Sequence, residues 1–113
     1  MSYSIGVDIV EWEKAKTFYE THRARLGTFL STTEKRFVED GRAPYRALAM
    51  IFASKEAVFK TLGLPWMGPE GFRRIKIRPV SYQAFISSAP DGRKLHITFK
   101  KSKRHVVACC AIS

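Results

Sequence analysis

The chain has 113 residues, and 45% of them are hydrophobic, which is enough for a single domain (1–113) around one core. No apolar run approaches the roughly 20 residues that span a bilayer, and the first 14 residues lack the pattern of a signal peptide. The two cysteines, Cys109 and Cys110, are adjacent, a spacing that suits neither a zinc site nor a redox pair. We therefore expect a cytoplasmic protein with reduced thiols and no membrane partner.

The charge balance is strongly basic. Twenty Lys and Arg residues against ten Asp and Glu give a net charge of +10. This excess predicts polyanionic partners, such as nucleic acid, phosphorylated cofactors, an anionic membrane surface or an acidic protein. No RNP-like aromatic pattern, Gly-x-x-Gly loop, zinc motif or basic recognition helix accompanies the charge, so we do not expect nucleic-acid binding.

The first half of the chain predicts one strand followed by helices. Residues 3–9 alternate between apolar and small or polar side chains, which indicates a half-buried strand. A helix is expected from about Val10. Residues 31–34 read Ser-Thr-Thr-Glu and have the form of a capping box for a short helix that ends near Asp40. A long helix is expected over 44–62, between a proline and a glycine.

The second half changes period from helix to strand. Residues 72–79 alternate and predict a strand, and 82–88 predict another. A turn at 90–92 leads into a strand at 95–99, and 105–112 form a last, mostly buried strand. One strand, then helices, then an antiparallel meander indicates an α+β fold with helices packed on one face of the sheet.

The long helix contains an unexpected pair of charges. Residues 52–63 read FASKEAVFKTLG, and Lys55 and Glu56 lie just downstream of seven residues, 47–53, without a polar side chain. A helix that is apolar nearly all round is usually buried, and a buried charge is costly unless it is paired or bound to an ion. Alternatively, Glu56 and Lys60 form an ordinary i,i+4 surface pair, worth roughly 0.2–0.5 kcal/mol.

Asp8 is a second unexpected acid. It shares a strand face with Gly6, which leaves room for a ligand to approach the backbone and the carboxylate. Alternatively, Asp8 and Glu11 have the spacing of a capping box for the first helix. If Asp8 and Glu56 meet, they could bind Mg²⁺, which takes one or two carboxylates and completes its shell with water and phosphate oxygens. Lys60 would then face those phosphates, although spacing alone does not show that the two acids meet.

Two segments together resemble a known family. IGVDIVE (5–11) followed by FASKEAVFKTLG (52–63) is similar to the paired motifs G-[IVL]-D-[IV]-x-E and F-x-x-K-E-A-x-x-K-A-[LF]-G of the holo-[acyl-carrier-protein] synthases, the small type of 4′-phosphopantetheinyl transferase. Residues 29–34 resemble the F-[TS]-x-x-E segment of that family, and 72–79 stand at its D-I-E-I strand. The resemblance covers nearly the whole chain. It implies a phosphopantetheinyl transferase-like fold, with a long central helix packed on an antiparallel sheet, and a homotrimer with sites between subunits.

The resemblance also implies an activity in lipid and fatty acid biosynthesis. Enzymes of this family transfer the phosphopantetheine arm of coenzyme A to a serine of an acidic acyl carrier protein and release adenosine 3′,5′-bisphosphate. By this resemblance Asp8 and Glu56 are magnesium ligands, and Glu56 also helps to deprotonate the serine. Lys60 would stabilise the leaving phosphate, and Lys55 would contact coenzyme A. Lys101 stands where the family has a histidine and could meet a coenzyme A phosphate.

Two positions depart from the family pattern. Ile51 replaces an arginine that helps to hold a coenzyme A phosphate, and Arg46, five residues earlier, falls on a different part of the helix. Lys101 replaces a histidine, and His105 lies four residues further on. The metal-binding half of the site therefore matches the family while the coenzyme A half is altered. The alternative to a working enzyme is a catalytically impaired paralogue that binds a carrier protein or a nucleotide.

A basic stretch in the second half allows two interpretations. Arg74, Lys76 and Arg78 would share one face of the strand predicted at 72–79. Such a face is either simply solvated or a docking surface for an acidic carrier protein. The sequence alone leaves both interpretations open.

Overall fold

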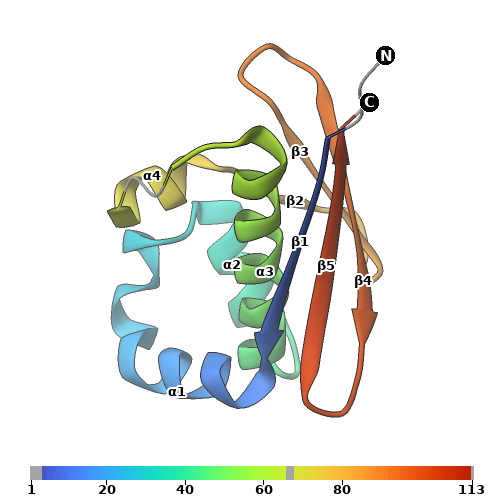
Figure 1. Ribbon diagram of the computed structural model, residues 1–113. Helices are drawn as coiled ribbons and strands as arrows, with labels where there is room; N and C mark the ends of the chain where they lie inside the picture. The colour runs from blue at the N-terminus through green and yellow to red at the C-terminus, as the bar shows by residue number, and fades with distance from the viewer. Residues whose placement is uncertain (1–3, 66–67, 113) are drawn as a thin grey trace.

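The protein is an α+β domain built on one antiparallel sheet (Figure 1). The computed structural model describes residues 4–65 and 68–112. The strand order in the sheet is β1-β5-β4-β3-β2. The strands are β1 (Ser4–Glu11), β2 (Arg78–Pro79), β3 (Ala84–Ser88), β4 (Lys94–Lys101) and β5 (His105–Ile112). The first strand therefore pairs with the last, and β1 and β2 form the two edges.

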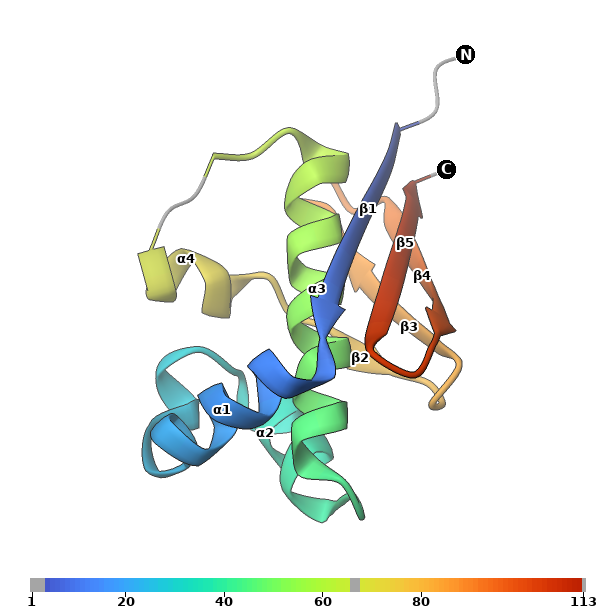
Figure 2. The same cartoon turned by 60° about the horizontal axis from the view of Figure 1, so that its bottom comes forward.

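One long helix packs against both the sheet and the other helices. The helix α3 (Pro44–Leu62) lies between the sheet and the other helices, as Figure 2 shows. The remaining helices are α1 (Trp12–His22), the 3₁₀ helix η1 (Arg23–Thr28), α2 (Thr32–Asp40) and α4 (Gly68–Arg74). No helix in the described ranges is both long and apolar enough to cross a membrane.

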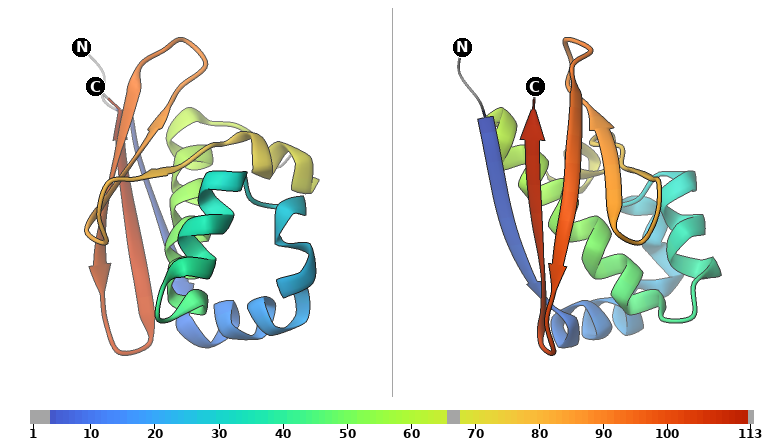
Figure 3. Two further views of the ribbon diagram at one scale, coloured as in Figure 1. Left: turned by 180° about the vertical axis from the view of Figure 1, so that it is seen from behind. Right: turned by 90° about the vertical axis from the view of Figure 1, so that its right-hand side faces the viewer.

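The two faces of the sheet differ. The inner face packs on α3 and supplies much of the core, including Leu95, Ile97, Val106, Ala108 and Cys110, all of them fully buried. None of the helices in residues 4–65 and 68–112 lies over the outer face, as the right panel of Figure 3 shows. The described helices therefore cover one side of the sheet, in agreement with the layer arrangement expected from the sequence.

Several sequence-based boundaries are confirmed. The long helix runs over 44–62, and Gly63 ends it in the left-handed conformation, with φ of 66°. The short helix begins with the expected capping box, in which Ser31 and Glu34 satisfy each other's backbone N–H groups. The last strand spans 105–112 as predicted.

The strand predicted at 72–79 is wrong in its first half. Residues 72–74 form the end of α4, and only Arg78–Pro79 pair with β3. The alternation itself is present, because Ile77 is buried while Lys76 and Arg78 are exposed. A short alternating run does not distinguish an extended segment from a strand, since only tertiary packing decides whether it pairs.

The first strand is longer than predicted and alternates as expected, although residue 3 of that prediction lies outside the described residues. Its apolar face is the exposed one: Ile5, Val7 and Ile9 are 63%, 46% and 59% exposed. The capping-box interpretation of Asp8 and Glu11 is wrong. The helix α1 begins only after Glu11, with no side-chain cap hydrogen bond, and Asp8 lies within the strand.

Candidate functional site

Three side chains from β1 and α3 meet on the inner side of the sheet. The Lys60 ammonium, in the last turn of α3, donates to Asp8 Oδ1 at 2.8 Å and to the Val7 carbonyl at 3.1 Å. Glu56 lies one turn earlier on the same helix, and its carboxylate interacts electrostatically with both Asp8 and Lys60. The fold thereby brings two acids and one lysine into one site, although Asp8 precedes Glu56 by 48 residues in the sequence.

A glycine explains how β1 approaches α3 so closely. Gly6 is buried, and a Cβ atom at this position would overlap the Ala57 carbonyl and the Thr61 hydroxyl. Thr61 in turn donates to the Ala57 carbonyl at 2.7 Å and lies 3.5 Å from the Cys110 carbonyl. Because side chains two apart on a strand share a face, this contact directs Asp8 toward the residues that follow Glu56 on the helix.

The electrostatics of the site favour an added cation. Burial raises the pKa of Glu56, the Asp8 carboxylate raises it further, and Lys60 opposes both effects. The hydrogen bond to Asp8 is the main cause that raises the pKa of Lys60. Two carboxylates thus share one ammonium and retain a negative charge that is costly where it is partly desolvated.

The donor set fits a hard divalent cation that is not fully enclosed by protein. Carboxylate oxygens are the ligands that Mg²⁺ prefers. Among residues 4–65 and 68–112, no group of three or more His, Cys, Asp or Glu side chains could hold a metal alone. An ion held by Asp8 and Glu56 would therefore need oxygens from water or from a bound phosphate, the arrangement typical of magnesium sites in phosphoryl-transfer enzymes.

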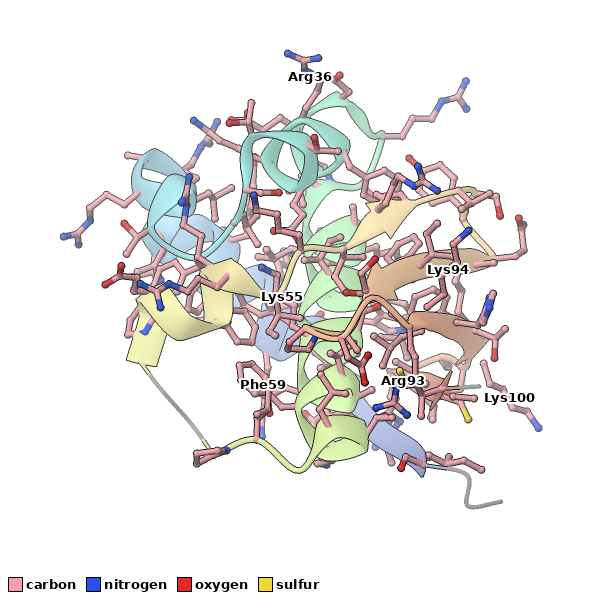
Figure 4. All side chains as sticks on the ribbon, turned by 90° about the horizontal axis from the view of Figure 1, so that it is seen from above. Arg36, Lys55, Phe59, Arg93, Lys94 and Lys100 are labelled. Carbon is pink, nitrogen blue, oxygen red and sulfur yellow. The ribbon has the colours of Figure 1, made fainter. Side chains whose placement is uncertain are left out.

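Lys55 lies elsewhere, in the interior of the protein (Figure 4). Its ammonium is 2.8 Å from Glu34 Oε1, and both side chains are 0% exposed. It also donates to the carbonyls of Phe29 and Phe72 at 3.2 and 3.0 Å. Burial lowers the pKa of Lys55, while the paired carboxylate opposes the shift. The expectation that Lys55 contacts coenzyme A finds no support in this arrangement, because all of these contacts are internal.

Glu34 has a role that the sequence showed only in part. Its Oε1 accepts from the Ser31 backbone N–H at 2.8 Å, as a capping box predicts. Its Oε2 also accepts from the Ile77 N–H at 2.6 Å, so the same carboxylate joins α2 to the segment before β2. Nothing in the sequence spacing indicated that this glutamate also neutralises Lys55.

A cavity of about 410 Å³ lies at the other end of α3, and its lining includes Lys101 and Arg46. Lys101 donates to the Tyr82 carbonyl at 2.9 Å, and the Arg46 guanidinium lies 4.6 Å from the centre of the Trp12 ring. Ile51, at the position of the family's arginine, is 0% exposed and belongs to the core. Sequence reasoning placed Arg46 apart from the altered positions, whereas the structure places it on the same cavity as Lys101.

Comparison with known proteins gives a consistent family. Residues 4–110 match the sequence model described as the 4′-phosphopantetheinyl transferase superfamily. The holo-[acyl-carrier-protein] synthase of Azoarcus sp. (strain BH72) is 30% identical over 122 aligned residues, covering 99% of this chain and 98% of that protein. The synthase of Blochmanniella pennsylvanica is 29% identical over 119 aligned residues, covering 96% and 95%.

Solved structures show the same fold. The holo-[acyl-carrier-protein] synthase of Neisseria meningitidis superposes with a TM-score of 0.79 at 23% identity, covering 97% of each chain. The synthase of Helicobacter pylori, in complex with coenzyme A, gives 0.78 at 23% identity, covering 96% of this chain and 99% of that one. Because the family model spans nearly the whole chain and the fold agrees, this protein is a transferase that belongs to the holo-[acyl-carrier-protein] synthase type of the 4′-phosphopantetheinyl transferase superfamily.

Proposed function

We propose that this protein transfers the 4′-phosphopantetheine arm of coenzyme A to a serine of an acyl carrier protein, with Mg²⁺ held by Asp8 and Glu56. The convergence of Asp8, Glu56 and Lys60 is the observation that carries the proposal. The relatives are named as synthases of holo-acyl-carrier-protein, and the Helicobacter pylori structure contains coenzyme A. When bound, Mg²⁺ would neutralise charge on the pyrophosphate.

The residues of this chain then have separate tasks. In the reaction the serine oxygen bonds to the phosphorus that bears the pantetheine arm, and the bond from that phosphorus to adenosine 3′,5′-bisphosphate breaks. Glu56 accepts the serine proton, a role that suits a carboxyl whose pKa is raised by burial and by Asp8. Lys60, which is 54% exposed, neutralises the negative charge that develops on the leaving phosphate.

We assign the nucleotide end of coenzyme A to the cavity lined by Arg46 and Lys101. Both are cations that line a partly apolar cavity, and its volume of about 410 Å³ lies in the range of small-molecule sites. The pair would replace the phosphate contact that the family makes through an arginine at the position of Ile51. Replacing Ile51 with arginine would bury a guanidinium in the core, so this substitution is not a clean test.

The exposed apolar face of β1 supports the proposed homotrimer. Ile5, Val7 and Ile9 project from an edge strand on the uncovered side of the sheet, beside Cys109 and Ala111 of β5. A contiguous apolar patch of this kind marks an interaction surface. Light scattering at micromolar concentration should report about three chains per particle, and Cys109 should react slowly with a maleimide in that particle. A monomer with a fast-reacting Cys109 would contradict the assembly.

The test of the function is the mass of the carrier protein. After incubation with coenzyme A and Mg²⁺, an apo carrier should gain the mass of one phosphopantetheine. Glu56→Gln should lower the rate by about 100- to 10,000-fold, the usual contribution of a general base. Glu39→Gln, an exposed acid on α2, is the matched control and should leave the rate unchanged. No mass gain on any carrier would favour the impaired paralogue.

Steady-state kinetics with coenzyme A test the assignment of its nucleotide end to the cavity lined by Arg46 and Lys101. Arg46→Ala and Lys101→Ala should each raise KM for coenzyme A about tenfold through the loss of a charge-assisted contact, with kcat little changed. Lys100→Ala, next in sequence and exposed, is the control. A drop in kcat with KM unchanged would place these two residues away from the nucleotide.

A further inference from the structure

A second cavity, which we call the basic groove, lies at the opposite edge of the sheet from Asp8. It has a volume of about 840 Å³, and it is formed by the start of α2, the end of α4, β2, β3 and the start of β4. Five cations line it: Arg73, Arg74, Lys76, Arg78 and Lys94. The other lining residues are Ser31, Thr32, Thr33, Ser87, Ser88, Ile77 and Ile86, so the lining contains no carboxylate.

Much of this positive charge is not compensated by the protein. In the part of the chain that the structure describes, no ion pair involves Lys76, Arg78 or Lys94. Arg74 pairs with Glu70 at 3.1 Å, but both side chains are more than 70% exposed, and such pairs contribute little. Like charges gathered in one groove repel each other, so a bound anion would stabilise them.

The backbone beneath these side chains is anchored. β2 is only two residues long, and its pairing with β3 ends at Arg78 and Ile86. Beyond that point Ser87 and Ser88 of β3 line the groove. The Ser87 hydroxyl donates to the Lys76 carbonyl at 2.7 Å, and the buried Glu34 accepts from the Ile77 N–H at 2.6 Å. Lys76 and Arg78 therefore project from a fixed segment.

The basic groove shares no lining residue with Asp8, Glu56 or Lys60. The groove lies against β2, β3 and the start of β4, and β5 separates these strands from β1, which bears Asp8. The groove also shares no residue with the cavity lined by Arg46 and Lys101. A ligand in the groove is thus a different ligand, or a different molecule, from coenzyme A at the proposed active site.

We propose that the basic groove binds a compact oligophosphate, an anion with two or more linked phosphate groups, through its phosphate oxygens. Arginine and lysine beside hydroxyl donors match phosphate oxygens, and arginine can contact two of them at once. No aromatic side chain lines the groove, so it offers no platform on which a base could stack. Recognition would therefore depend on the phosphates, whether they belong to inorganic polyphosphate or to a nucleotide.

The test is titration calorimetry with tripolyphosphate in magnesium-free buffer, which keeps a metal at Asp8 and Glu56 from contributing. One tripolyphosphate should bind per chain, ATP should bind about equally well, and adenosine should not bind. Lys76→Ala, Arg78→Ala and Lys94→Ala should each weaken binding about tenfold, the value of one charge-assisted contact. Lys100→Ala is the matched control, because Lys100 is on the same strand and the same face as Lys94 but outside the groove.

Two further measurements separate the alternatives. Amide chemical shifts should change at 31–33, 76–78 and 86–88 when tripolyphosphate is added, and Glu56→Gln should leave the affinity unchanged. Absence of binding, or equal losses in Lys94→Ala and Lys100→Ala, would overturn the proposal and leave only a general attraction of anions to a chain of charge +10. Tighter binding of an octa-uridylate or an octa-glutamate peptide at the same residues would overturn it in favour of RNA or an acidic protein.

Discussion

The helix α3 contributes one lysine to each of two acid–lysine pairs that have the same length and opposite surroundings. Lys55 pairs with Glu34 and Lys60 pairs with Asp8, each at 2.8 Å. In the first pair both side chains are 0% exposed, whereas in the second they are 54% exposed for Lys60 and 17% for Asp8. The distance between the charges therefore does not distinguish the two pairs, and their surroundings do.

The difference in surroundings indicates which of the two acid–lysine pairs can take part in a reaction. Around Lys55 and Glu34, four backbone groups use the remaining hydrogen-bonding capacity, and they come from 29–31, from α4 and from the segment before β2, so the pair holds elements together. Beside Lys60 and Asp8 there is an additional acid, Glu56, and contact with solvent. A closed pair fixes structure, and an open pair with an excess carboxylate can bind a cation or a substrate.

Breaking the closed pair should have the largest effect on stability. Glu34→Ala leaves the Lys55 ammonium buried without its partner and removes the acceptor of the Ile77 N–H. We expect a loss of about 3–5 kcal/mol in the free energy of unfolding, measured by urea denaturation. Asp8→Ala, which breaks a pair of equal length, is the comparison and should cost about 1 kcal/mol or less. Equal losses would remove the distinction between the pairs.

Gly6→Ala should move the open pair apart. The new Cβ atom would overlap the Ala57 carbonyl, a backbone atom of α3 that cannot rotate away. We expect a loss of about 1–3 kcal/mol, together with slower transfer to the carrier protein. Gly27→Ala is the control, because a Cβ atom there meets nothing within 4 Å. Unchanged activity in Gly6→Ala would mean that the spacing of β1 and α3 does not set the site.

Lys60→Met should separate activity from stability. Because the pair with Asp8 is exposed, unfolding should change by less than about 1 kcal/mol. The transfer rate should fall about 10- to 100-fold through loss of a charge-assisted contact with the leaving phosphate. The variant should also bind Mn²⁺, a probe for Mg²⁺, more tightly in the absence of substrate, because the ammonium no longer occupies Asp8. Weaker Mn²⁺ binding would contradict the assignment of Asp8 as a metal ligand.

The smallest expected effect concerns the charge of Glu56. Because its pKa is raised in the folded state, the folded protein binds this proton more tightly than the unfolded chain, and the resulting stabilisation is lost as pH rises through the folded pKa. Glu56→Gln should therefore raise Tm slightly at pH 7, and the gain should vanish near pH 4. Adding Mg²⁺ should stabilise the wild type more than the variant. A variant less stable than the wild type without Mg²⁺ would contradict the electrostatic description.

Local sequence signals determined the elements that have local causes. Pro44 set the start of α3 through its fixed φ, and Gly63 set its end because glycine readily adopts a positive φ. Ser31 and Glu34 set the start of α2 through side-chain hydrogen bonds to nearby N–H groups. The same local reasoning failed at 72–74, because an alternating run of a few residues is compatible with a helix end, and the packing of α4 decided its conformation.

The site shows the same division between local and distant causes. Charges in apolar or glycine-lined settings made Asp8, Glu56 and Lys60 candidates, beside a capping box and a surface pair as alternatives, and the family resemblance in the sequence selected them. It could not assign Lys55 to Glu34 rather than to a ligand, nor place Arg46 beside Lys101, nor show that Ile5, Val7 and Ile9 face outward. These relations join residues that are distant in the chain or depend on which face a helix covers, so only the tertiary structure decided them.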